Sequence, residues 1–206
     1  MIIAVDGPTA SGKGTIAKAL AAHFSLPYLD TGLLYRAVGF EVRRRGGDPD
    51  DPADALGATD FNDDLLGDPV LRSEATGGLA SRVSVHPTVR HALFERQRAF
   101  ATREGGAILD GRDIGTVIAP DADVKLFITA SVPARAKRRW NEMLDRGDPS
   151  SIEEIEADIA RRDERDARRK DAPLVAAIDA HVLDTSELDR EEAIRAAIEA
   201  VEQLRA

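Results

Sequence analysis

The stretch Ile2–Thr15 has the sequence IIAVDGPTASGKGT. Its first part, Ile2–Val5, is a short apolar run with β-branched side chains, which is typical of a buried parallel strand. A glycine-rich turn follows, and the small and apolar residues of Thr15–Phe24 then predict a helix. A turn of this kind, placed between a strand and a helix, favours an α/β fold and directs attention to the chemistry of the turn itself.

The turn has the composition of a phosphate-binding loop: Gly7-Pro8-Thr9-Ala10-Ser11-Gly12-Lys13-Gly14-Thr15. Glycines let backbone N–H groups point inward without a Cβ in the way, and the N-terminus of the following helix adds partial positive charge. Lys13 supplies a compact positive charge for the β- and γ-phosphates of a nucleotide. Gly14 stands where Ser or Thr usually follows the lysine, so Thr15 becomes the candidate for contact with phosphate or with the water shell of Mg²⁺. The alternative is a chance match, and the flanking strand and helix argue against it.

Strands and helices alternate along the rest of the chain. We expect further strands at 27–29, 107–109, 124–128 and 181–184, and helices at 33–45, 87–104, 133–146, 152–170 and 191–204. This order predicts a three-layer α/β fold, with a central parallel sheet covered by helices. Residues 47–78 are polar and acidic with many turn residues, and we expect there an insert that is partly ordered or shortly helical.

Composition excludes several classes of function. The 206 residues suffice for one well-buried core, and the absence of cysteine excludes disulfides and thiolate metal sites. A net charge of −9 disfavours a nucleic acid polymer as the main partner. The N-terminus lacks the features of a signal peptide, and no window approaches 18 consecutive apolar residues. We therefore expect a cytoplasmic, monomeric enzyme that does not bind membranes.

A second element supports the use of a nucleotide triphosphate. The predicted strand Ala107–Leu109 is followed directly by Asp110, which is the form of a carboxylate that orients Mg²⁺ through water. Many strands end in an aspartate that serves only as a turn residue. Beside a phosphate loop, however, the pattern favours the Mg²⁺ role for Asp110.

Two segments bear on the group that receives the phosphate. Thr31 and Arg36, with Tyr35 between them, place a hydroxyl and an arginine at a helix start, which suits a phosphate or a ribose. Arg112 and Asp113 follow the strand that ends in Asp110, so they offer donors and an acceptor side by side. Cytosine presents both an amine donor and two acceptors on its Watson–Crick edge, whereas uracil fits such a pair poorly. The alternative is a surface ion pair in a turn.

Together these motifs resemble bacterial cytidylate kinases. The resemblance covers nearly the whole chain in family order, and its most specific element is the Asp-Gly-Arg-Asp-Ile-Gly-Thr segment. The motifs are GPTASGKGT at 7–15, LDTGLLYR at 29–36, PTVR at 87–90 with QR at 97–98, DGRDIGT at 110–116 and RRDERDARR at 161–169.

The resemblance implies transfer of the ATP γ-phosphoryl group to CMP or dCMP, with Mg²⁺ as cofactor. It implies ribose or phosphate contacts for Thr31, Arg36 and Arg90. It also implies base contacts for Ser81, Arg112 and Asp113, with Ser84 close to the first of these in sequence. Arg138 would lie near the bound ATP.

The resemblance further makes the arginine-rich segment near residue 165 a mobile lid over both substrates. Arg162 and Arg169 would contact phosphates, and Asp166 would contact the sugar. On the residues alone, Asp158, Arg162 and Asp166 stand four residues apart and could form ordinary surface ion pairs on a helix. A lid suits the chemistry, because phosphoryl transfer requires positive charge on the transferring group and exclusion of water.

The resemblance divides the chain into a core, a monophosphate-binding region and a lid. The core comprises about 1–30, 104–146 and 171–206, the monophosphate-binding region about 31–103, and the lid about 147–170. Long-form members of the family carry a three-stranded element in the second region, and residues 48–72 lack the alternation for it. Two rival interpretations stay open: a related kinase acting on UMP, AMP, shikimate or dephospho-coenzyme A, and a nucleotide-binding module without transfer activity.

Overall fold

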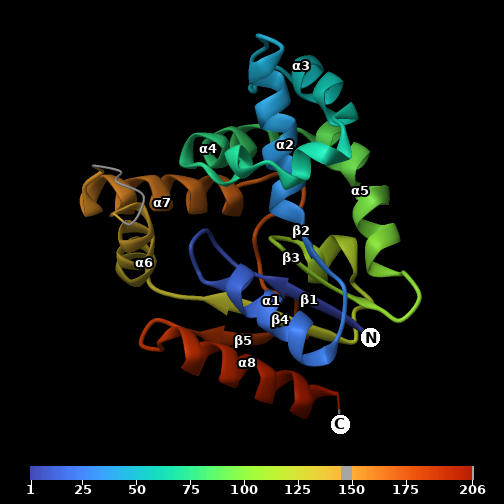
Figure 1. Ribbon diagram of the computed structural model, residues 1–206, viewed down its shortest axis with the longest axis vertical. Helices are drawn as coiled ribbons and strands as arrows, with labels where there is room; N and C mark the ends of the chain where they lie inside the picture. The colour runs from blue at the N-terminus through green and yellow to red at the C-terminus, as the bar shows by residue number, and fades with distance from the viewer. Residues whose placement is uncertain (145–149, 206) are drawn as a thin grey trace. The chain divides into compact units, whose positions relative to one another are not determined.

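The computed structural model describes residues 1–144 and 150–205 (Figure 1). The chain divides into two compact units. The first is formed by Met1–Leu29 with Ala101–Ala206, and the second by Asp30–Phe100. The first unit is built around the central sheet, and the second is built from helices.

The sheet has five strands in the order β2-β3-β1-β4-β5. β1 lies in the middle and pairs in parallel with both β3 and β4, while β5 pairs in parallel with β4. This confirms the predicted α/β class with a central parallel sheet. The strands are β1 (Ile2–Asp6), β2 (Tyr28–Asp30), β3 (Ala107–Gly111), β4 (Val124–Thr129) and β5 (His181–Asp184).

Helices α1 (Lys13–Phe24) and α8 (Arg190–Leu204) pack against one face of this sheet (Figure 1). Ile3 and Val5 of β1 contribute to the core on that face, since alternate side chains of a strand point to the same side. α8 begins with a capping box, in which Asp189 and Glu192 each accept a backbone N–H of the first turn. By the same alternation, Ile2, Ala4 and Asp6 face the opposite side of β1.

Helices α6 (Val132–Leu144) and α7 (Ile152–Ala167) form a hairpin with a small apolar core of its own. The predicted end of the first helix, Arg146, and the predicted lid residues 147–149 lie outside the described residues. α7 ends at Ala167 rather than at Lys170, and the arginines after it stand beyond the helix. Throughout the described part of the chain, no helix is both long and apolar enough to cross a membrane.

The second unit packs its helices around a separate core that includes Leu34, Val38 and Leu93. A side chain at Gly39 would meet Leu79 at 2.7 Å, so α2 and α4 approach each other closely there. Its elements are α2 (Thr31–Arg44), α3 (Pro52–Gly57), three single-turn helices η1 (Ala58–Asp60), η2 (Asp63–Gly67) and η3 (Pro69–Arg72), α4 (Glu74–Val83) and α5 (Pro87–Ala101).

The acidic stretch within residues 47–78 forms short helices, which is one of the two forms expected for it. Its aspartates act as helix N-caps: Asp51 accepts two backbone N–H groups of α3, and Asp68 accepts one from η3. Arg82 of α4 binds Asp48 at 2.9 Å and Asp50 at 2.6 Å. Charge neutralisation and capping therefore give these residues defined positions in the unit.

Three features of the structure differ from the elements expected from the sequence. Helix α4 is not among the elements expected from the sequence; it contains Gly77 and Gly78, and Ser73 caps its N-terminus. α5 ends at Ala101 instead of Glu104, and Gly105 and Gly106 then adopt positive φ angles. The single-turn helix η4 (Ile114–Ile118) follows β3, in a segment for which the sequence predicts no element.

Candidate functional site

The glycine-rich turn joins β1 to α1, as predicted, and its backbone has little room for other residues. A side chain at Gly7 would lie 2.1 Å from the backbone oxygen of Ile128. Gly12 has φ 87° at the N-cap of α1, and Ala10 has φ 59°. Glycine adopts such positive φ angles readily, whereas other residues adopt them rarely. The turn is therefore defined by its backbone, as a cradle of N–H groups requires.

Lys13 is the first residue of α1, and its Nζ donates to the carbonyl oxygen of Pro8 at 3.3 Å. The ammonium group thus lies over the turn rather than extending away from it. No side chain among the described residues caps the N-terminus of α1. The partial positive charge of the helix and the charge of Lys13 consequently act on the same small volume.

Asp110 lies near the end of β3, and its carboxylate is held beside the phosphate loop. Oδ1 accepts the hydroxyl of Tyr28 at 2.7 Å, and Oδ2 would lie 3.6 Å from a methyl group placed on Gly14. Thr15 is exposed on the first turn of α1. Among the described residues no cluster of three acidic, histidine or cysteine side chains could enclose a metal. A hard cation bound at Asp110 would therefore take its other oxygen ligands from phosphate and water, as Mg²⁺ usually does.

Asp6, at the end of β1, is a buried carboxylate that sequence reasoning passed over. Oδ1 accepts the backbone N–H of Ile114 at 2.9 Å, and Oδ2 accepts that of Gly115 at 2.8 Å. Burial outweighs these two hydrogen bonds and raises the pKa of Asp6 to about 7. Asp6 thereby fixes η4, the turn that directly follows Arg112 and Asp113. Its place one residue before Gly7 was the available signal.

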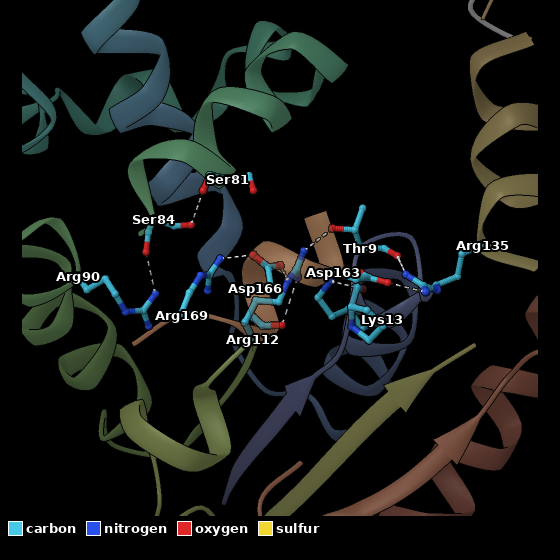
Figure 2. A network of polar contacts seen from close by, with 12 residues as sticks. Thr9, Lys13, Ser81, Ser84, Arg90, Arg112, Arg135, Asp163, Asp166 and Arg169 are labelled. Atoms are coloured by element: carbon cyan, nitrogen blue, oxygen red, sulfur yellow. Dashed lines mark hydrogen bonds and ion pairs between the residues drawn. The ribbon is translucent and has the colours of Figure 1, made fainter. Parts of the chain in front are cut away.

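Arg112 connects the loop after β3 with the phosphate loop and with α7 (Figure 2). Its Nη2 donates to Oγ1 of Thr9 at 2.7 Å, and its Nε donates to Oδ2 of Asp166 at 2.8 Å. The ion pair of Arg112 is thus made with the predicted lid. Its neighbour Asp113 is buried at the start of η4.

Asp166 is 2% exposed and binds two arginines, Arg112 and Arg169. Burial alone would raise the pKa of Asp166, but the positive charges of these two arginines outweigh it and hold that pKa below its usual value. Arg162 is also buried and pairs with Asp158 at 2.8 Å. Most of these groups are withdrawn from solvent, which separates the arrangement from the surface ion pairs that the spacing alone allowed.

Two arginines of α6 bind backbone carbonyl groups of the phosphate loop. Arg138, predicted to lie near ATP, donates to the carbonyl oxygen of Ser11 at 3.4 Å and to Oγ1 of Thr185 at 3.1 Å. Arg135, which sequence reasoning missed, donates to the carbonyl oxygen of Thr9 at 3.1 Å and forms a 2.7 Å ion pair with Asp163. The run of basic residues at 135–139 was the only signal for it.

In the second unit, Arg90 brings several predicted residues together. Its guanidinium lies 5.7 Å from the ring centre of Tyr35, and its Nη1 donates to the carbonyl oxygen of Ser84 at 3.5 Å. The hydroxyl of Ser84 donates in turn to the carbonyl oxygen of Ser81 at 3.1 Å (Figure 2). α2, α4 and α5 are thereby connected through one group of polar side chains.

Arg36 binds backbone carbonyl groups of the same unit. Its Nη1 donates to the carbonyl oxygens of Leu71 and Ser73, at 2.7 and 2.8 Å, so it supports the chain between η3 and α4. Thr31, the first residue of α2, is buried. The structure thus places Thr31 and Arg36 on one helix, α2.

Known relatives match the chain over its full length. The family model described as cytidylate kinase matches residues 3–203. A cytidylate kinase of Caulobacter sp. (strain K31) is 54% identical over 206 residues, covering all of this chain and 95% of that protein. One from Cereibacter sphaeroides is 56% identical over 200 residues, covering 97% of this chain and 94% of that protein.

The fold also has a counterpart among solved structures. The crystal structure of an uncharacterized protein from Eubacterium ventriosum ATCC 27560 superposes with a TM-score of 0.58 at 16% identity, covering 98% of each chain. That likeness supports the fold alone. The family model and the full-length relatives confirm the resemblance drawn from the motifs, and the chain belongs to the cytidylate kinase family.

Proposed function

We propose that the protein transfers the γ-phosphoryl group of ATP to CMP or dCMP, giving ADP and CDP or dCDP. Membership of the cytidylate kinase family makes it a phosphotransferase. The observation that supports the site best is the 2.7 Å hydrogen bond from Arg112 to the hydroxyl of Thr9. It joins the loop proposed to read the acceptor to the loop proposed to hold the donor.

In the proposed reaction, an oxygen of the acceptor's monophosphate forms a bond to the γ-phosphorus of ATP. The bond between that phosphorus and the bridging oxygen of ADP breaks. Negative charge spreads over the transferring group during this step, so catalysis consists mainly of positioning and positive charge. Lys13 and the N–H groups of the phosphate loop supply that charge on the donor side, and Arg112, Arg162 and Arg169 supply it around the transferring group.

The donor set around Asp110 fits Mg²⁺. Its buried carboxylate lies beside Gly14, and the hydroxyl of Thr15 stands on the next residue. Mg²⁺ bound here would neutralise charge on the β- and γ-phosphates. The remaining ATP contacts are assigned to the backbone of Gly7–Thr15 and to Arg138.

The acceptor contacts follow from the family resemblance. We assign the ribose and monophosphate to Thr31, Arg36 and Arg90, the latter with Tyr35 against its guanidinium, and the sugar also to Asp166. Ser81, Arg112 and Asp113 are assigned to the base. Asp113 carries the base preference, because its carboxylate can accept the exocyclic amine of cytosine and would face a carbonyl in uracil.

The test follows ADP production from Mg-ATP with separate acceptors: CMP, dCMP, UMP, AMP, GMP, TMP, shikimate and dephospho-coenzyme A. We expect turnover with CMP and dCMP far above the others, and Asp113→Ala should narrow the preference for CMP over UMP. Strong turnover with another acceptor would overturn the assignment of Arg112 and Asp113. ATP binding without turnover would instead support a nucleotide-binding module.

We also propose that the enzyme works as a monomer in the cytoplasm, where its nucleotide substrates are found. No polymeric nucleic acid or membrane is needed as a partner for this reaction. Light scattering coupled to size-exclusion chromatography measures the mass directly. A mass of twice 22.2 kDa or more would contradict the monomer.

A further inference from the structure

The α6–α7 hairpin is joined to the rest of its unit by few apolar contacts. Its own core consists of four buried residues, Ala136, Met143, Ile155 and Ile159, with partly buried side chains around them. From the phosphate loop only Ala10 joins this cluster. Polar contacts near Thr9 therefore have a large share in fixing α7, the helix that carries Arg162.

Thr9 accepts hydrogen bonds from two arginines, each at a different oxygen atom. Arg112 donates to its hydroxyl, and Arg135 donates to its carbonyl oxygen. Each arginine also binds one acid of α7, Arg112 to Asp166 and Arg135 to Asp163. The two acids stand three residues apart, about one helical turn, so they share one face of α7. We call these five residues the Thr9 ring.

The two halves of the Thr9 ring differ in strength. Asp166 is bound at both oxygens, whereas Asp163 is bound at Oδ2 only; its Oδ1 is buried without a hydrogen bond among the described residues. Arg135 is held independently of Asp163, because its Nε donates to the carbonyl oxygen of Ala130 at 2.8 Å. The contact between Arg135 and Asp163 is therefore the one that can be weakened without displacing the arginine.

We propose that Arg135 and Asp163 are positioning residues that couple α7 to the conformation of the phosphate loop through Thr9. Neither residue has to touch a nucleotide for this. When α7 is in place, Arg135 is drawn to its acid while it holds the carbonyl group of Thr9, and the loop keeps the shape required for phosphate. The expected effect on the rate of phosphoryl transfer rests on the proposed function, whereas the coupling itself can be measured without substrate.

The first experiment is hydrogen–deuterium exchange on the substrate-free protein with Asp163→Asn. The backbone amides of residues 9–12 should exchange at least about fivefold faster, the lower end of ordinary coupling between sites. Asp163 is linked to that loop by its ion pair with Arg135, which donates to the carbonyl oxygen of Thr9. Glu164→Gln is the matched control, since it changes the next residue of α7 and should leave the loop unaltered. Unchanged exchange at 9–12 in Asp163→Asn would overturn the proposal.

The reverse experiment changes Thr9 in the phosphate loop and measures exchange in α7. It can be carried out even if Asp163→Asn does not fold. Thr9→Val removes the hydroxyl that accepts Arg112 and keeps the side-chain volume, whereas Thr9→Ser keeps the hydroxyl. Because coupling is reciprocal, Thr9→Val should speed exchange in the last turn of α7, and Thr9→Ser should not. Equal behaviour of the two variants would contradict the ring.

A kinetic cycle then separates positioning from simple loss of stability. Arg135→Gln and Asp163→Asn should each lower kcat with CMP about tenfold, with a smaller change in the KM for CMP, within the range usual for coupled sites. The double variant should be no slower than Arg135→Gln alone, and Trp140 fluorescence reports whether the hairpin core stays packed. Additive losses would overturn the proposal, while an inactive wild-type protein with the exchange effects intact would count against the proposed function only.

Discussion

Asp6 and Asp166 are two buried carboxylates of the same unit that are stabilised in opposite ways. Asp6, 5% exposed at the end of β1, accepts two backbone N–H groups of η4. Asp166, 2% exposed on α7, is bound by the guanidinium groups of Arg112 and Arg169. Burial raises the pKa of Asp6 to about 7, whereas the two positive charges hold the pKa of Asp166 below its usual value.

The difference shows how the two sides of the site are held. A carboxylate on the central strand needs no counter-charge to fix a turn, because the backbone N–H groups of that turn come to it with the fold. The carboxylate on α7 is held by charged side chains, one of which, Arg112, belongs to another segment, and such a contact can form and break as the segments move. The sheet therefore supplies a permanent anchor and the hairpin a separable one.

The largest effect is expected for Asp166→Asn. The substitution leaves Arg112 and Arg169 without their common carboxylate in a mostly buried place, which costs roughly 3 kcal/mol or more of unfolding free energy. Because both arginines also lose their positions toward the transferring phosphoryl group, kcat with CMP should fall at least about 100-fold. Chemical denaturation and the ADP assay measure the two effects.

Asp166→Ala offers a second view of the same contact. It removes the carboxylate without inserting an amide donor toward the arginines, and it should be no more active than Asp166→Asn. Near-wild-type turnover in either variant would show that the ion pairs on α7 are only structural.

Asp6→Asn should produce a smaller loss with a distinctive dependence on pH. At pH 5 the folded Asp6 is protonated and has two oxygens that can accept, whereas an amide has one, so at pH 5 the variant should be less stable by about 2 kcal/mol. The folded protein binds the Asp6 proton more tightly than the unfolded chain does, so the contribution of Asp6 is complete below about pH 4 and declines up to about pH 7. The stability advantage of the wild type over Asp6→Asn should therefore shrink between pH 5 and about pH 7 and change no further up to pH 8.

The comparison with Asp166 sharpens this result, because its sign is reversed. The contribution of Asp166 is present above about pH 4, the range of an ordinary aspartate, and is lost as pH falls through its lowered pKa. Between pH 5 and 8 the advantage of the wild type over Asp166→Asn should thus stay constant. Urea denaturation of both variants across this range checks the pair, and parallel curves would mean that the two carboxylates are held alike.

The sheet and the phosphate loop could be predicted because their determinants are local. The apolar run before Gly7, the glycines of the turn and the acid after Ala107–Leu109 each specify a conformation or a chemistry within a few residues. The parallel strands and the α/β class are confirmed accordingly. The roles of the individual site residues and the boundaries of the three predicted regions stay predictions.

What escaped prediction depends on contacts between distant segments. Asp6 stands next to Gly7, but its role depends on Ile114 and Gly115, which lie more than a hundred residues away. Arg135 is one of several basic residues in its helix, and only the fold brings it to the carbonyl group of Thr9. α4 was missed for a different reason: close packing of Leu79 against Gly39 of α2 stabilises a helix that its glycines disfavour.

Gly115→Ala tests the anchor at Asp6 with a minimal change. The added methyl group would lie 3.2 Å from Cδ of Lys125 and 3.4 Å from Oδ2 of Asp6. Lys125 is itself held by a 2.7 Å ion pair with Asp179, so it cannot simply move away. We expect a loss of about 1 kcal/mol in unfolding free energy from this overpacking.

Gly57→Ala is the matched control for that substitution. Gly57 has φ −59°, and no atom of the described residues lies within 4 Å of the added methyl group. Thermal unfolding should show a neutral or slightly stabilised protein, because alanine restricts the unfolded chain. Equal losses at both glycines would mean that the methyl group at 115 does not act through Lys125 and Asp6.

The smallest effect is expected for Glu164→Gln, which removes an ion pair of α7 that lies outside the Thr9 ring. Its partner is Arg168 at 3.0 Å, with the two side chains 58% and 79% exposed. Solvent screens such a pair, so the unfolding free energy should change by less than about 0.5 kcal/mol and kcat should not change. Asp163 and Asp166 flank this residue on either side in the sequence, and charge loss at each of them is expected to slow the enzyme. If Glu164→Gln slowed it equally, the total charge of α7 would govern the lid, and the specific contacts of Asp163 and Asp166 would not.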